Sequence, residues 1–283
     1  MILSLGTPHT LAGFQIMDPK GIFNVNPLTA AREVLPEPAA ANKFIAFSSY
    51  CDQTVAGMKY LAKEYGLTKA CTMYLHRFRR DISAATKEKA TEAGMTFVSE
   101  TTHKPDEQDF VGAVQKLKAD GCQVVTVALG VRAGITVVGT AKQLGWTDVK
   151  FLTTSAGFLE AVAAVPGGVT DGLYAAAGWV DLHARKDDPV PAKFIADYGA
   201  KYGQPATGFA MLGYSTADTL IRALEAAGPD LTQASFKAAM ESLDYYDELL
   251  DAAIKYTAEN HQGANTVTIS VAKDGLWNLV SRQ

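Results

Sequence analysis

The chain has 283 residues, of which 48% are hydrophobic and 20% are charged, and its formal net charge is −4. This length suffices for two domains or one large one, and the composition is ordinary for a globular protein. The small negative charge and the lack of a polybasic tail argue against nucleic acid or an anionic membrane as the main partner. No apolar run approaches the roughly 20 residues needed to cross a bilayer.

The N-terminus and the cysteines say little about compartment. Residues 1–5 are apolar but have no basic flank and no small-residue cleavage site, so we expect no secretory signal there. The chain has three cysteines, Cys51, Cys71 and Cys122, and no two of them form a CxxC pair. The cysteines therefore indicate neither a zinc site nor a disulfide scaffold. Cys71 and Cys122 both begin expected strands and would lie close together if those strands are parallel neighbours. Two buried thiols are the favoured interpretation.

The first half of the chain predicts alternating strands and helices. A strand ends at Leu5, and a helix follows with Thr7 as its N-cap and Pro8 at its first position. Asp52 is expected to cap a second helix. The other expected strands are residues 22–25, 43–48, 70–75 and 95–99; a helix is expected at 82–93, with loops at 27–30, 36–41 and 76–80.

The stretch from residue 108 to 146 organises the rest. It reads as a helix that Asp106 caps, an apolar strand at 124–129, and a second helix. A run of apolar residues without alternation is typical of a strand buried on both faces of a parallel sheet. Such doubly wound α/β units place their ligands outside the carboxyl ends of the strands. The remaining expected elements are strands at 150–154 and 173–179, helices at 191–202, 208–227 and 231–243, and a hairpin of 266–271 with 276–280.

Motifs for catalysis or cofactor binding are missing from the sequence. No GxGxxG or GxxxxGK[ST] follows a strand, there is no HExxH, and the five histidines share no metal-ligand spacing. Residues 213–217 only partly match a nucleophile elbow and fall within an expected helix. We therefore predict no catalytic residue, no metal site and no cofactor.

Several stretches carry a resemblance to a known family when they are taken in order. They are SLGTP before a helix, KGIFNVNPLTA, DFVGAVQKLKADGCQVVTVAL, AKQLGW, GYSTADTLIRALEAAG and the terminal DGLWNLVS. Together they resemble the type I periplasmic solute-binding proteins, and most closely the branched-chain amino-acid (Leu/Ile/Val) binding family of ABC importers. The resemblance extends over essentially the whole chain.

The resemblance implies an α/β fold of two lobes, each a doubly wound parallel sheet flanked by helices, that close like a hinge on a small molecule. Lobe 1 would comprise residues 1–48 and 175–264, and lobe 2 residues 49–174 and 265–283. Crossing strands would lie near 43–48, 173–179 and about 263–268. Family members begin with roughly two further βα units before SLGTP, so the resemblance implies an incomplete first lobe.

The strand-exit rule and the resemblance together nominate the ligand contacts. In lobe 1 these are Gly6, Thr7, Leu28 and Thr29. Thr7 at a helix N-terminus suits a carboxylate, although a helix cap alone is an equal alternative. The lobe 2 candidates are Phe78, Arg79, Gly130 and Ser155.

Two of the lobe 2 positions depart from the family pattern. The family usually places an aromatic residue and a glycine where this chain has Phe78 and Arg79. The alternative to ligand contact here is a solvated loop, and an arginine at this position suits an acid group. Amino-acid binders of the family carry an acidic residue at the position of Ser155, where it holds the ligand's ammonium group. Ser155 provides no such charge unless Glu160 substitutes for it, so a plain amino acid is in doubt and a carboxylic or aromatic acid fits as well.

The sequence thus predicts a non-enzymatic, periplasmic solute-binding component of an ABC transporter, with a membrane permease as partner. The alternative is a ligand-sensing regulator or receptor domain of the same fold. An α/β enzyme would require a nucleophile and a base that converge in the cleft.

Overall fold

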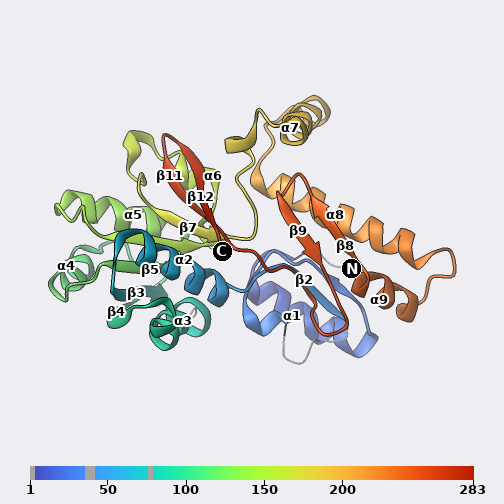
Figure 1. Ribbon diagram of the computed structural model, residues 1–283, viewed down its shortest axis with the longest axis horizontal. Coiled ribbons are helices and arrows are strands. Elements are labelled where there is room, and N and C mark those ends of the chain that lie inside the picture. Colours follow the sequence, from blue (N-terminus) through green and yellow to red (C-terminus); the bar gives the residue numbers. More distant parts are fainter. Residues whose placement is uncertain (1–3, 36–41, 76–78) are drawn as a thin grey trace. The chain divides into compact units, whose positions relative to one another are not determined.

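The computed structural model describes residues 4–35, 42–75 and 79–283, which form two compact units (Figure 1). Unit 1 comprises residues 1–48 and 178–266, and unit 2 comprises residues 49–177 and 267–283. Each unit therefore combines segments that are far apart in the sequence.

Unit 2 is built around a seven-stranded sheet with the order β12-β11-β7-β6-β5-β3-β4. The strands are β3 (Lys69–Leu75), β4 (Thr96–His103), β5 (Val124–Ala128), β6 (Lys150–Thr154), β7 (Tyr174–Ala177), β11 (Thr268–Lys273) and β12 (Leu276–Arg282). Strands β3 to β7 run parallel, whereas β11 is antiparallel to β7 and β12. The doubly wound parallel arrangement that the sequence predicts is confirmed in this unit.

Helices cover both faces of this sheet. A Cβ on Gly57 of α2 would collide with Leu152 of β6, whereas Gly134 of α5 faces Val127 of β5. Leu152 pairs with Thr126, the residue before Val127, and successive strand residues point to opposite faces, so α2 and α5 lie on opposite faces. All five residues of β5 are buried, as its apolar run predicts. The helices of unit 2 are α2 (Tyr50–Tyr65), α3 (Ala84–Lys89), α4 (Val111–Ala119), α5 (Val131–Gln143) and α6 (Glu160–Ala163).

Unit 1 has a smaller parallel sheet in the order β1-β2-β10. Its elements are β1 (Asn24–Val25), β2 (Lys43–Phe47), β10 (Gln262–Ala264), α1 (Thr7–Met17), α7 (Pro189–Tyr202), α8 (Gly208–Ala227), α9 (Gln233–Glu241) and the hairpin of β8 (Asp244–Asp247) and β9 (Ala252–Lys255). The fully buried ring of Phe44 stacks on His261 with 3.9 Å between ring centroids and meets Tyr256 edge-on. Strand β2 therefore lies at the centre of the core of unit 1.

The cysteines correct one sequence-based interpretation. Cys71 and Cys122 form a disulfide, with their Cα atoms 5.8 Å apart, and are not two free thiols. Strands β3 and β5 are parallel neighbours in which Ala70 pairs with Val124, and this pairing brings the two cysteines together. Cys51 is the free, buried cysteine.

In unit 2, the N-terminal caps of α2 and α4 differ from the predicted ones. Ser49, not Asp52, caps α2, because the Ser49 hydroxyl accepts a hydrogen bond from the Asp52 N–H. Helix α4 begins at Val111, whose N–H donates to Asp109 Oδ1 at 2.9 Å, so Asp106 is not its cap. In both regions several capping residues stand close together, and composition alone does not choose among them.

Other bounds are partly as predicted. Helix α8, strand β6 and the terminal hairpin are confirmed. The helix expected at 82–93 is instead a π-helical turn (Arg79–Ser83), the short α3 and a 3₁₀ turn (Thr91–Ala93). The hairpin β8–β9 was not predicted, because its strands are only four residues long and carry little apolar alternation. The connector predicted at 36–41 lies outside the described residues.

Candidate ligand-binding site

The predicted contacts of unit 1 meet at the first turn of α1. Leu5 and Leu28 form a parallel bridge, and the Gly6 N–H donates to the Leu28 carbonyl at 3.1 Å. This pairing places the Thr7 and Thr29 hydroxyl oxygens 2.7 Å apart, in hydrogen-bond contact. Gly6 occupies the N-cap position of α1 with φ 87°, a backbone conformation that glycine adopts without steric cost. Thr7 is therefore the first residue of the helix and not its cap, which corrects the predicted start.

The hydrogen bond between the Thr7 and Thr29 hydroxyls uses only one of their two O–H protons. Either hydroxyl can donate to the other, and Thr29 Oγ1 also accepts from the Ala31 N–H at 3.3 Å. In both arrangements one O–H proton is left over, and the first-turn N–H groups of a helix have no partner inside the helix. A hydroxyl proton beside a helix N-terminus is suited to an oxygen acceptor such as a carboxylate.

A buried polar network fixes the turn that leads to Leu28 and Thr29. Asn26 adopts φ 50°, a left-handed conformation that asparagine tolerates. Its Oδ1 accepts from the Tyr256 hydroxyl at 2.8 Å, and its N–H donates to the Phe44 carbonyl at 2.9 Å. Burial raises the pKa of Tyr256, so its phenol remains a neutral donor. The network was not predicted, because Tyr256 lies 230 residues from Asn26 in the sequence.

The strand exits of unit 2 share one edge of its sheet, because β3, β5 and β6 are parallel neighbours. Gly130 is exposed and occupies the N-cap position of α5. Ser155 begins a 3₁₀ turn, η6 (Ser155–Gly157), and its N–H donates to Oε1 of the buried Gln53 at 2.9 Å. Gln53 is a supporting residue that sequence reasoning missed, since a lone glutamine inside a helix gives no signal.

Two predicted ligand contacts of unit 2 remain, Phe78 and Arg79. Phe78 lies outside the described residues. Arg79 begins the π-helical turn that follows β3. Ligand contact by either residue stays a prediction, as it does for the other six nominated positions.

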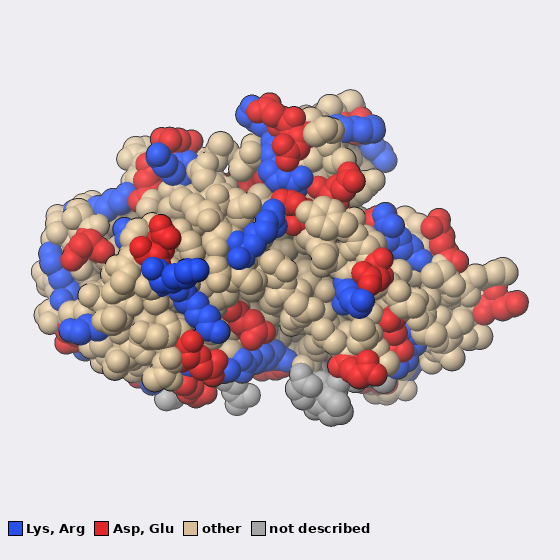
Figure 2. Space-filling model, viewed as in Figure 1, with Lys and Arg blue, Asp and Glu red and all other residues tan. Residues whose placement is uncertain are grey.

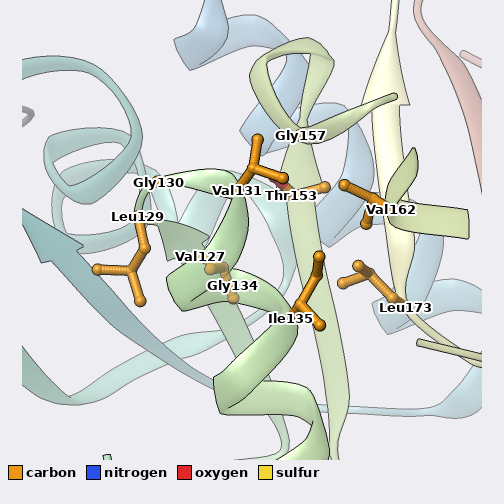
Figure 3. A pocket seen from close by; sticks show the side chains of 10 residues that line it. All are labelled: Val127, Leu129, Gly130, Val131, Gly134, Ile135, Thr153, Gly157, Val162 and Leu173. Atoms are coloured by element: carbon orange, nitrogen blue, oxygen red, sulfur yellow. The ribbon is translucent and has the colours of Figure 1, made fainter. Parts of the chain in front are cut away.

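An apolar hollow opens beside Gly130 within unit 2. It encloses about 310 Å³, including its open mouth, between α5, the end of β6, η6 and α6 (Figure 3). Its lining residues are Val127, Leu129, Gly130, Val131, Gly134, Ile135, Thr153, Gly157, Val162 and Leu173. Most of this volume is open solvent at the mouth, and the enclosed part has room for about one water molecule.

The charged surface offers no single dominant feature. On the drawn face, the Lys and Arg side chains of the described residues are interspersed with Asp and Glu, and no broad area of one sign stands out (Figure 2). Among residues 4–35, 42–75 and 79–283, no helix combines the length and apolarity that a membrane span requires. Within the same ranges, no group of three or more His, Cys, Asp and Glu side chains is placed to hold a metal ion.

Comparison with solved structures shows which fold this is. A branched-chain amino-acid ABC transporter protein from Thermus thermophilus with bound valine is 20% identical, with a TM-score of 0.84, over 99% of this chain and 76% of that one. A fatty acid ABC transporter substrate-binding protein from Thermomonospora curvata is 20% identical, with a TM-score of 0.84, over 99% of this chain and 74% of that one. An ABC transporter solute-binding protein from Rhodopseudomonas palustris in complex with benzoate is 18% identical, with a TM-score of 0.81, over 98% of this chain and 76% of that one. No curated protein matches the sequence.

The fold thus belongs to the class of α/β ligand-binding proteins with the type I periplasmic-binding-protein architecture. The family model described as periplasmic binding protein matches residues 1–275, so the chain belongs to the periplasmic binding protein family. The resemblance drawn from the sequence is confirmed. The family is one of non-enzymatic solute-binding proteins.

Proposed function

We propose that the chain is the extracytoplasmic solute-binding component of an ABC importer and that it binds a small carboxylic acid with an apolar body. The similar proteins described above are named for valine, fatty acid and benzoate, three carboxylates whose apolar bodies differ. The bound form would be presented to a membrane permease. The Cys71–Cys122 disulfide supports this location, because disulfides persist in oxidising compartments.

The Thr7–Thr29 hydroxyl pair at the N-terminus of α1 is the observation that carries this proposal. It supplies O–H and N–H donors, which complement an oxygen anion. The neutral Ser155, at the position where amino-acid binders of the family have an acid, supplies no charge for an ammonium group. An acid without an amino group avoids burying an unpaired ammonium ion, which is costly.

Calorimetric titration of the full chain with pentanoate, benzoate, valine and leucine tests the proposal. We expect the two simple acids to bind more tightly than the two amino acids. Thr7→Val and Thr29→Val keep the side-chain shape but remove a donor to a charged acceptor, so each should weaken acid binding by about 10- to 100-fold.

Thr96→Val is the matched control, because Thr96 is an exposed residue at the start of β4 in unit 2. Its affinity should equal that of the unchanged protein. Wild-type affinity in both threonine variants would disprove the assigned role of the hydroxyl pair. Binding of none of the four compounds would disprove the proposed ligand class.

A further inference from the structure

Asn26 is a buried residue that three separate segments of unit 1 hold in place. It is 3% exposed, its N–H donates to the Phe44 carbonyl of β2, and its Oδ1 accepts from the Tyr256 hydroxyl just beyond β9. Its Nδ2 lies 3.5 Å from Thr219 Oγ1 on α8. The backbone N–H and both ends of the side-chain amide therefore have partners, and all of these partners belong to the same unit.

The donors and acceptors around Thr219 fix how the Asn26 amide is oriented. The Thr219 hydroxyl has one proton and donates it to the Ser215 carbonyl at 2.9 Å. Thr219 Oγ1 is then an acceptor, both for the Tyr245 hydroxyl at 2.8 Å and for the Asn26 amide. Burial raises the pKa of Tyr245 to about 12, so this phenol keeps the proton that it donates. The Asn26 amide is thus held with Oδ1 toward Tyr256 and Nδ2 toward Thr219.

The backbone of Asn26 needs this support. Its φ of 50° lies in the left-handed region, which is unfavourable for a residue with a Cβ. The next residue is Pro27, and the ring of a proline restricts the backbone of the residue before it. Gly263 of β10 leaves space for the supporting phenol, because a Cβ there would lie 2.8 Å from the Tyr256 hydroxyl oxygen. Residues that the surrounding structure holds in such unfavourable conformations are concentrated at functional sites.

The turn at Asn26 leads directly to the Thr7–Thr29 hydroxyl pair. Only two residues separate Asn26 from Thr29 in the sequence. The second of them, Leu28, accepts a hydrogen bond from the Gly6 N–H at the start of α1. Thr29 follows, and its hydroxyl lies 2.7 Å from that of Thr7. A change in the turn would therefore move Leu28 and Thr29 relative to the first turn of α1.

We propose that Asn26 is a positioning residue for acid binding, because its left-handed turn sets the Thr29 hydroxyl against that of Thr7. Tyr256 acts only through Asn26 and does not touch the ligand. This inference rests on the proposed function and adds to it the residues that hold the hydroxyl pair ready before the acid arrives. A site that is already ordered costs less to bind to, so loss of this support should lower the affinity although no contact with the acid is removed.

Calorimetric titration of the full chain with pentanoate tests the role of Tyr256. Tyr256→Phe leaves Asn26 Oδ1 buried without its donor, and we expect it to weaken pentanoate binding about 3- to 10-fold. Tyr246→Phe is the matched control, because the exposed phenol of Tyr246 lies in the same unit and donates to Asp251 instead. Its affinity for pentanoate should equal that of the unchanged protein.

Two substitutions of Asn26 separate its backbone conformation from its side-chain contacts. Asn26→Ala and Asn26→Gly both remove the amide, but only glycine adopts a φ of 50° without steric cost. Asn26→Ala should therefore weaken pentanoate binding more than Asn26→Gly does. Adding Tyr256→Phe to Asn26→Gly should change the affinity less than about twofold, because the phenol then has no residue through which to act. Equal affinities of the alanine and glycine variants, or fully additive effects of Asn26→Gly and Tyr256→Phe, would disprove the inference.

Threonine methyl NMR of the ligand-free full chain gives a readout that does not depend on the ligand. Tyr256→Phe should shift the methyl signals of Thr7 and Thr29 and leave the signal of Thr96, in unit 2, unchanged. Unshifted Thr7 and Thr29 signals would disprove the positioning role even if the affinity falls. If the unchanged protein binds neither pentanoate nor benzoate, the proposed function is disproved, and the methyl signals still decide whether Asn26 positions the hydroxyl pair.

Discussion

His261 and Glu241 show how a single buried contact ties elements of unit 1 together. His261 is 1% exposed; its Nδ1 contacts the Lys43 carbonyl at 2.9 Å and its Nε2 contacts Glu241 Oε1 at 3.0 Å. Burial works against the ionised Glu241, but the hydrogen bonds from Lys237 and His261 outweigh it and hold the pKa of Glu241 below its usual value. The ionised carboxylate is thus bound more favourably in the folded protein than in the unfolded chain.

A lowered carboxyl pKa has a definite effect on stability. The stabilisation is fully present above the unfolded pKa of about 4.3 and is lost as the pH falls through the lower, folded value. Glu241→Gln should lower the free energy of unfolding at pH 7 by about 1–2 kcal/mol, and this deficit should shrink as the pH falls below the unfolded pKa of about 4.3. Urea unfolding as a function of pH measures it. Glu225→Gln, on the exposed side of α8, is the control, and a deficit that does not change with pH would contradict the assignment.

At the scale of single residues, the sequence could nominate strand-exit positions but not their partners. Thr7 and Thr29 were nominated because both follow expected strands, and the structure joins their hydroxyls. Gln53 was missed because its role depends on a tertiary neighbour, the Ser155 N–H, which is 102 residues away in the sequence. Residue type and local spacing do not predict contacts between residues that are far apart in the sequence.

At the scale of elements, the start of α2 offers a clear test of which residue caps it. The Ser49 hydroxyl accepts from the Asp52 N–H at 3.1 Å, and the same hydroxyl donates to Asp52 Oδ2 at 2.6 Å. Ser49→Ala should therefore lower the free energy of unfolding by about 1 kcal/mol, and Ser49→Asn, which keeps a capping oxygen, should restore most of it. Chemical unfolding followed by circular dichroism measures both variants. A larger loss for Asp52→Asn than for Ser49→Ala would mean that Asp52 is the principal cap after all.

The elements that the sequence predicted best are those with a long, unambiguous pattern. Helix α8 spans 20 residues with a consistent buried face and has a capping threonine and a C-terminal glycine at its ends. Strand β5 was recognisable because five consecutive buried residues require an apolar run. Strand β10, with three residues, depends on pairing with β2 from more than 200 residues away in the sequence, so no local pattern could give its bounds.

At the scale of the whole molecule, two interleaved chain segments build each unit, and the disulfide joins two parallel strands within unit 2 alone. Both sulfurs come from unit 2, at a sequence separation of 51 residues, and Cys51 is not involved. Closing a loop of this length restricts the unfolded chain, which by the loop-entropy relation stabilises the folded state by about 4 kcal/mol. The effect should therefore fall on unit 2 and leave unit 1 almost unchanged.

The double variant Cys71→Ala/Cys122→Ala tests this difference between the units. Its free energy of unfolding should fall by about 4 kcal/mol relative to the oxidised protein, and addition of a thiol reductant to the unchanged protein should have a similar effect. Hydrogen-exchange mass spectrometry should locate the loss of protection in residues 49–177 and 267–283, because only these segments belong to unit 2. Cys51→Ala controls for the loss of a buried thiol. A thiol reductant should lower its free energy of unfolding by the same amount as it lowers that of the unchanged protein. Equal unfolding midpoints with and without reductant would show that the Cys71–Cys122 disulfide adds no stability. A loss of hydrogen-exchange protection spread equally over both units would show that the two units unfold together.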